Sequence, residues 1–159
     1  MPGATEAIEH QVRVDAPPEL VFEYFTDPSK FVRWMGSDAT LDPRPGGVCR
    51  FVVNGAAMVG EYVEVEFPWR LVFTWGWETR LFEVAERSTA VEVSLTPDGD
   101  GTLVRLTHSR LPEGAVAFHR AGWDHYLGRL AAAATGDPGP DPWADLSVVA
   151  RAIRAAAER

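Results

Sequence analysis

The chain has 159 residues, 46% of them hydrophobic, which is enough for one domain with a single core. Acidic residues outnumber basic ones by 23 to 15, giving a net charge of −8. This balance excludes the clustered basic surface that nucleic acids and anionic membranes require. The only cysteine, Cys49, cannot form an internal disulfide, and neither a leader-like N-terminus nor a run of ~20 apolar residues is visible. We therefore expect a cytoplasmic protein with no nucleic-acid or membrane partner.

The N-terminal region predicts one strand followed by two short helices. Residues 8–14 alternate between apolar and polar side chains, the period of a strand with one buried face. Pro17 and Pro18 end this strand and suit the first turn of a helix. That helix covers residues 19–26, and a second helical segment covers residues 29–34.

Residues 38–110 predict an antiparallel meander, because β-branched and aromatic runs alternate with turn signals. Asn54-Gly55 is one such signal, typical of a type I′ hairpin turn. We expect six or seven strands in total. In the strand over residues 58–67 the inward frame contains either Tyr62 or Glu61. We favour Tyr62, since an unpaired buried carboxylate is costly.

The C-terminal part predicts a long helix, a linker and a final short helix. The long helix covers residues 115–134 and would be about 30 Å long at 1.5 Å per residue. Residues 137–145 are rich in proline and glycine and form a predicted linker between a domain over 1–136 and an amphipathic helix over 146–159. The apolar stripe of this last helix requires a partner surface, either on its own domain or across a homodimer interface.

Three segments carry a family resemblance. They are Val14–Glu19 with Trp34, Arg44–Gly47 with Arg50-Phe51, and Thr107-His108 with Gly122-Trp123. In this order they resemble the START-like, Bet v 1-like (SRPBCC) superfamily, and within it the branch named for homology to the C-terminal domain of the activator of Hsp90 ATPase. The resemblance covers roughly residues 8–134.

The resemblance implies an α+β helix-grip fold. In this fold a curved six- to seven-stranded antiparallel sheet wraps around a long C-terminal helix, and two short helices follow the first strand. The superfamily includes lipid carriers, plant hormone binders, polyketide cyclases and cochaperone domains. It therefore implies an internal pocket more strongly than any one activity.

The candidate pocket wall consists of inward-facing apolar and aromatic side chains of the strands and helices, as is typical of ligand pockets. A histidine or tyrosine among them, His108 or Tyr62, is the candidate polar anchor. The alternative is that the same side chains fill a solid core, and the sequence does not separate the two. The candidate ligand-binding residues are Phe22, Phe25, Trp34, Phe51, Val53, Tyr62, Phe73, Trp75, Trp77, Val93, Leu106, His108, Trp123, Tyr126 and Leu127.

Two histidines, His10 and His108, each interrupt an apolar alternation. The first and last strands of a helix-grip fold pair with each other, so we expect the two imidazoles to be neighbours. They would bind a ligand oxygen, transfer protons, or be structural. His119 and His125 are six residues apart on the long helix, and we expect both to be exposed to solvent. We expect no metal or cofactor, because a zinc site needs three protein ligands and no glycine-rich phosphate loop is present.

These observations predict binding of an apolar or aromatic small molecule, lipid- or polyketide-like, in the internal pocket. One alternative is a cyclase- or hydrolase-type enzyme in the same pocket, although no catalytic constellation is recognised. The other is a protein-interaction module of the Hsp90 cochaperone type. The chain lacks the additional N-terminal domain of the eukaryotic activator, so an Hsp90-type partner is not expected.

Overall fold

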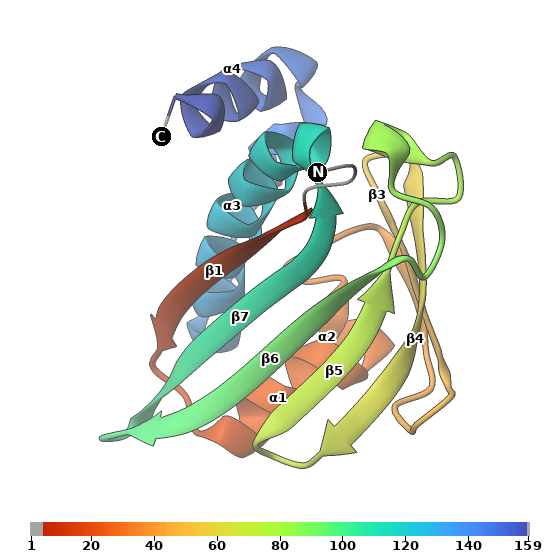
Figure 1. Cartoon of the computed structure of the whole chain (residues 1–159). Helices are drawn as coiled ribbons and strands as arrows, with labels where there is room; N and C mark the ends of the chain where they lie inside the picture. The colour runs from red at the N-terminus through yellow and green to blue at the C-terminus, as the bar shows by residue number, and fades with distance from the viewer. Residues whose placement is uncertain (1–4, 159) are drawn as a thin grey trace.

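Seven strands form one antiparallel sheet in the order β1-β7-β6-β5-β4-β3-β2. The structure, a computed structural model, describes residues 5–158. The sheet is curved, and its concave side holds the helices (Figure 1). This α+β arrangement confirms the predicted helix-grip class. The strands are β1 (Thr5–Val14), β2 (Asp38–Leu41), β3 (Val48–Val53), β4 (Ala56–Glu66), β5 (Arg70–Trp75), β6 (Thr89–Asp98) and β7 (Gly101–Pro112).

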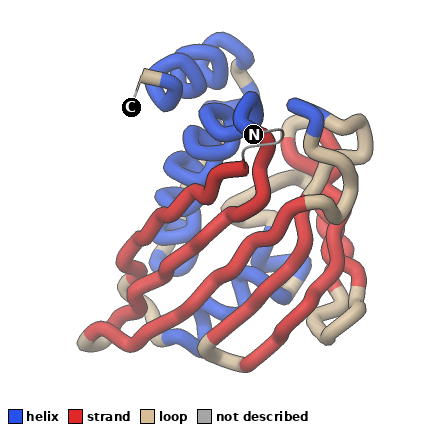
Figure 2. Tube along the Cα trace, in the orientation of Figure 1, coloured by secondary structure: helices blue, strands red, loops and turns tan. Residues whose placement is uncertain are grey.

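The helices α1, α2 and α3 lie on one face of the sheet (Figure 2). The first two follow β1 directly, as predicted, and the long helix α3 follows β7. No helix among residues 5–158 is both long and apolar enough to cross a membrane. The helices are α1 (Pro18–Thr26), α2 (Pro28–Phe31), α3 (Val116–Thr135) and α4 (Leu146–Ala157), with the single-turn helices η1 (Leu81–Glu83), η2 (Glu113–Ala115) and η3 (Pro142–Ala144).

Local chemistry explains where α1 and α2 begin. Pro18 occupies the first turn of α1, where its missing N–H has no partner to lose. Asp27 caps α2, accepting a hydrogen bond from the backbone N–H of Ser29 at 2.9 Å. Gly36 then carries the chain past β3 at a φ of 83°, where a Cβ atom would lie 2.5 Å from the carbonyl oxygen of Val52.

The register of the sheet decides which side chains face the helices. Ile8 of β1 pairs with His108 of β7, and His10 pairs with Leu106. In β4, Tyr62 is 1% exposed while Glu61 is exposed, which confirms that Tyr62 faces inward. The Tyr62 hydroxyl donates to the carbonyl oxygen of Phe25 at 3.1 Å, so the strand that looked ambiguous is fixed to α1.

The C-terminal segment folds back along α3. The Arg129 guanidinium on α3 donates to the carbonyl oxygen of Gly139 at 3.0 Å, and α4 packs chiefly against α3 (Figure 1). In the predicted stripe of α4, Val149 and Ile153 are half-buried against the core, Ala157 is exposed, and the side chain of Leu146 lies outside the described residues. The described part of the apolar face of α4 is therefore partly covered by its own domain.

Candidate ligand-binding site

A cavity of about 210 Å³ lies between α3 and the concave face of the sheet. Part of its wall comes from residues that were predicted to face inward, namely Val53, Trp75 and Trp77 from strand alternation and Trp123 and Tyr126 from the long helix. The rest comes from residues that the sequence did not single out as ligand contacts. They are Met35, Asn54, Ala56, Leu81, Phe118, His119, Gly122, Trp143 and Val149.

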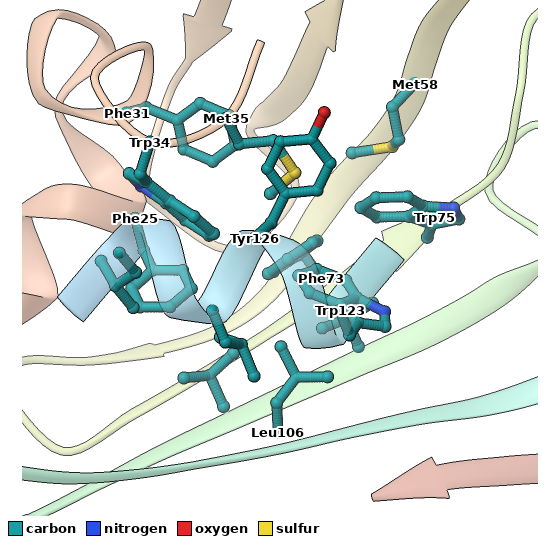
Figure 3. Packing of buried hydrophobic residues seen from close by; sticks show 14 of the residues in the cluster. Phe25, Phe31, Trp34, Met35, Met58, Phe73, Trp75, Leu106, Trp123 and Tyr126 are labelled. Atoms are coloured by element: carbon teal, nitrogen blue, oxygen red, sulfur yellow. The ribbon is translucent and has the colours of Figure 1, made fainter. Parts of the chain in front are cut away.

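The elements around the cavity position these side chains by their own periodicity. Trp75 ends β5, and Trp77 follows two residues later on the same face, with its ring centroid 5.3 Å from that of Trp75. On α3, His119, Trp123 and Tyr126 are spaced at four and three residues, so they project from one side of the helix. Figure 3 shows Trp75, Trp123 and Tyr126 close together in this part of the molecule.

The imidazole of His119 is held in one neutral tautomer. Its Nε2 accepts the indole N–H of Trp77 at 3.1 Å, and its Nδ1 lies 2.7 Å from the carbonyl oxygen of Ala115. A carbonyl only accepts, so Nδ1 carries the proton. Burial lowers the pKa of His119 to about 4, since the charged form would have to leave water. The imidazole is therefore neutral at pH 7.

His108 is neutral in the opposite tautomer. Its Nδ1 accepts the indole N–H of Trp123 at 3.0 Å, and its Nε2 lies 2.8 Å from the hydroxyl of Thr89. That hydroxyl donates to the carbonyl oxygen of Trp75, so Nε2 carries the proton of His108. Burial, and secondly the neighbouring His119, hold the pKa of His108 well below its usual value.

The indole of Trp75 differs from its two neighbours. Trp77 and Trp123 donate to histidines, whereas the buried Nε1 of Trp75 has no hydrogen-bond partner among the described residues. An unsatisfied buried donor costs roughly 1–3 kcal/mol. The core beside the cavity therefore contains one indole N–H without a hydrogen-bond partner among the described residues.

His10 and His108, which we expected to be neighbours, each make their side-chain contacts with other residues. The register sets Leu106 opposite His10, and His10 Nδ1 lies 3.1 Å from the carboxylate of Asp124 on α3. His108 instead packs against His119, with ring centroids 5.3 Å apart. The expectation that His119 is exposed was wrong, since it is 3% exposed. Six-residue spacing separates the two helix histidines by face, but it does not say which face meets the sheet.

A polar cluster lies beside the cavity, and its members Asn54, Tyr126 and Trp143 line it. Asp141 accepts hydrogen bonds from the Tyr126 hydroxyl at 2.8 Å and the Trp143 backbone N–H at 2.9 Å, and it lies 2.7 Å from His125 Nε2. Burial alone would raise the pKa of Asp141, but these hydrogen bonds outweigh it and leave that pKa lowered. Asn54, in the β3–β4 turn, donates to the Tyr126 hydroxyl at 3.3 Å. The cluster thus ties a hairpin, α3 and the C-terminal segment together.

The other predicted ligand-binding residues are buried in the core and do not line the cavity. Alternation predicts which side chains face inward, but it cannot say which inward side chains meet each other and which leave a space. The polar side-chain atoms of His108 and Tyr62, the candidate polar anchors, are hydrogen-bonded to other parts of the protein. The residues are Phe22, Phe25, Trp34, Phe51, Tyr62, Phe73, Val93, Leu106, His108 and Leu127.

The site offers shape and aromatic surface. Within residues 5–158, no group of three or more histidine, cysteine, aspartate or glutamate side chains could hold a metal ion. The thiol of Cys49 is buried, and burial raises its pKa to about 12, so it stays protonated at neutral pH. What the arrangement can do is enclose a flat, mainly apolar molecule.

Comparisons with known proteins agree with this fold. The family described as "Activator of Hsp90 ATPase homolog 1-like protein" matches residues 15–135. No curated protein matches the chain. An AHSA1-like protein from Rhizobium etli is 42% identical, with a TM-score of 0.68 over 88% of this chain and 89% of that one. CalU16 from Micromonospora echinospora is 29% identical, with a TM-score of 0.74 over 99% of this chain and 91% of that one.

A third relative bears on assembly. The Aha1 dimer from Colwellia psychrerythraea is 20% identical, with a TM-score of 0.71 over 80% of this chain and 95% of that one. At this identity the likeness concerns the fold alone. A relative with the same fold therefore exists as a dimer.

Proposed function

Since this chain belongs to the family of activator of Hsp90 ATPase homolog 1-like proteins, with its START-like helix-grip fold, we propose that it binds a small aromatic molecule in the cavity beneath α3. The observation that carries the proposal is the wall itself. Aromatic rings border the space from β5, from α3 and from the C-terminal segment, through Trp75, Trp123 and Trp143. Ligand sites are typically such concave apolar surfaces with a few placed polar groups.

The size of the cavity narrows the ligand class. An engineered apolar cavity of about 150 Å³ holds one benzene molecule, and this cavity measures about 210 Å³. A molecule of one or two fused rings suits this volume better than an extended acyl chain. Within the predicted lipid- or polyketide-like range, the volume therefore favours a compact aromatic compound.

The polar atoms near the cavity do not narrow the class further. Trp75 Nε1 has no partner among the described residues, but it is buried from the cavity as well as from solvent, so a ligand atom in the cavity does not reach it. The residues that line the cavity are mainly apolar and aromatic. We therefore favour a compact aromatic molecule whose contacts with the wall are mainly apolar.

No specific observation favours the enzymatic alternative. Each ring nitrogen of His108 and His119 has a protein partner, and both pKa values are lowered. A general base needs a free lone pair within reach of the substrate proton. His10 and Asp124 form a pair at the edge of α3 and are not among the residues that line the cavity.

Gly122 offers a direct test, because it lines the cavity and a Cβ atom added there meets nothing within 4 Å. Gly122→Leu would fill the space without disturbing the backbone. Gly128→Leu is the matched control, since Gly128 lies on the same helix, also has open space around a Cβ atom and is not part of the wall. Both changes remove a helix glycine and have similar effects on helix propensity.

The measurement is titration with 2-naphthol, followed by tryptophan fluorescence and by calorimetry. We expect saturable one-site binding to the unaltered protein and to Gly128→Leu, and at least tenfold weaker binding to Gly122→Leu. Naphthalene should bind with an affinity similar to that of 2-naphthol, because the wall is mainly apolar. Equal binding to the two leucine variants, or no saturable binding to the unaltered protein, would overturn the proposal.

A further inference from the structure

The C-terminal segment after residue 135 contributes directly to the cavity, and we infer that Trp143 in it is a ligand-contacting residue that determines which molecules are accepted. This inference rests on the proposed function. The family match ends at residue 135, yet Trp143 and Val149 line the cavity together with α3 and β5. The common family domain therefore provides part of the site, and the segment of this chain provides another wall.

Trp143 is placed as a fixed aromatic surface. It is 4% exposed, and its ring stacks on His125 with centroids 4.6 Å apart and an angle of 7° between the planes. It also meets the ring of Tyr126 edge-on, at 5.7 Å and 70°. Two side chains of α3 thus hold the indole in one orientation at the border of the cavity, as a ligand-stacking residue requires.

The backbone around Trp143 is positioned by one carboxylate. Asp141 accepts the Trp143 backbone N–H and is itself anchored by the Tyr126 hydroxyl. Because Tyr126 also lines the cavity, the same residue that holds the segment in place contacts the enclosed space. A molecule that fills the cavity would contact both Tyr126 and Trp143.

The segment is attached in a way that allows it to open. The backbone–backbone hydrogen bonds of residues 137–158 all lie within that segment, at its turns and in α4. Its polar ties to the domain are side-chain contacts, such as those of Arg129 to Gly139 and of Asp141 to α3, and its apolar ties are Trp143 and the face of α4 that packs on α3. A segment without sheet pairing can separate from a domain without breaking the hydrogen bonds of the sheet. Displacement of this segment would therefore admit a ligand while the β-sheet stays intact.

Compact planar molecules are the class that this wall selects. They allow Trp143 to remain stacked on His125 and to cover the ligand at the same time. An aromatic molecule with a bulky substituent would have to displace the indole, and would lose the contact with it. We therefore expect 2-naphthol to bind with Trp143 in place, and a naphthol carrying a long alkyl chain to gain nothing from it.

The test measures dissociation of 2-naphthol from the full-length protein by stopped-flow fluorescence. 2-Naphthol should dissociate about tenfold faster from Trp143→Ala and bind to it about tenfold more weakly. Trp143→Phe should retain most of the affinity for 2-naphthol. Trp69→Ala is the matched control, because Trp69 is 48% exposed in the β4–β5 turn and does not line the cavity. Its dissociation rate should equal that of the unaltered protein.

The outcomes separate this inference from the proposed function. Normal binding by the unaltered protein together with an unchanged dissociation rate in Trp143→Ala overturns the role of Trp143 and leaves the cavity proposal standing. Loss of the difference between Gly122→Leu and Gly128→Leu overturns the cavity itself. Should Trp143→Ala fail to fold, hydrogen exchange on the unaltered protein decides. Bound 2-naphthol must slow exchange in residues 139–150, and unchanged exchange there contradicts the inference.

Discussion

The two ends of the concave face are built from the same kinds of side chain but differ in how they are filled. Under α1 and α2, the ring of Phe31 lies 4.5 Å from Phe51 and 5.2 Å from Trp34. Under the N-terminal half of α3, the ring of Trp75 lies 5.3 Å from Trp77 and 5.2 Å from Trp123. Ring spacing is therefore similar at both ends, and the cavity of about 210 Å³ lies at the second end, where Trp75, Trp77 and Trp123 line it.

The difference lies in what restrains the rings and what faces them. Trp34 donates its indole N–H to the carbonyl oxygen of Tyr24 within the helical layer, and its ring closes the core there. At the other end Trp77 and Trp123 donate to His119 and His108, so they cannot rotate into the free space without losing a buried hydrogen bond. Gly122 faces the same space with no side chain at all. Aromatic content alone does not decide whether an interior is solid or hollow.

The largest expected effect is on the free energy of unfolding, in two single variants that each remove one tryptophan ring, one at each end of the concave face. Trp34→Ala should lower the free energy of unfolding by about 3–5 kcal/mol, because it opens a void in a filled region and leaves a carbonyl unpaired. Trp77→Ala also leaves a buried acceptor unpaired, Nε2 of His119, but it should cost at least about 1 kcal/mol less, since one side of the Trp77 ring already faces a cavity and has fewer contacts to lose. Urea unfolding measures both. Equal losses would mean that the two ends are equally well packed.

Lowering the pH should destabilise the protein through His108 and His119, which lie at the end of the core that borders the cavity. In the unfolded chain both histidines titrate near pH 6.5, whereas in the folded protein the pKa of His119 is about 4 and that of His108 is well below 6.5. Between pH 6.5 and 4 the unfolded state therefore binds more protons. The free energy of unfolding should fall as the pH is lowered, with a slope that approaches about 1.4 kcal/mol per pH unit for each histidine midway through this range.

The control for this pH dependence is the double variant His108→Gln, His119→Gln, measured in the same buffers. It should be less stable at pH 7 but show a shallower slope between pH 6.5 and 4. Asp141 acts in a lower range, because its pKa lies below the unfolded value of 3.8 and its contribution is lost only below that value. A slope that the double variant leaves unchanged would assign the acid sensitivity to other groups.

The smallest effect concerns Gly122. Gly122→Ala should raise the free energy of unfolding by about 1 kcal/mol, since alanine is a better helix former and its Cβ enters open space. Gly128→Ala, in equally open surroundings, should give the same gain. A loss of stability in Gly122→Ala alone would show that this end of the core is tighter than the cavity implies, and would weaken the contrast between the two ends.

Much of the fold was predictable because it follows from local rules. Proline placement marks the start of α1, alternation marks the strands, and helical periodicity marks α3 to within a residue at each end. The inward direction of Tyr62 followed from the cost of burying Glu61 in its place. The cavity wall was only partly predictable, since Gly122 and Met35 carry no sequence signal for a ligand contact. Trp143 was overlooked because it lies in a segment that reads as a linker.

The sequence by itself determined which residues of an element share a face, because side-chain direction follows from periodicities of two and 3.6 residues within each element. Tertiary structure alone decided that His108 meets His119 and Trp123 while His10 meets Asp124, and that the C-terminal segment returns to close the cavity. These outcomes depend on the distances between elements far apart in the chain. Whether facing side chains touch or leave a space depends on those distances, and local periodicity contains no information about them.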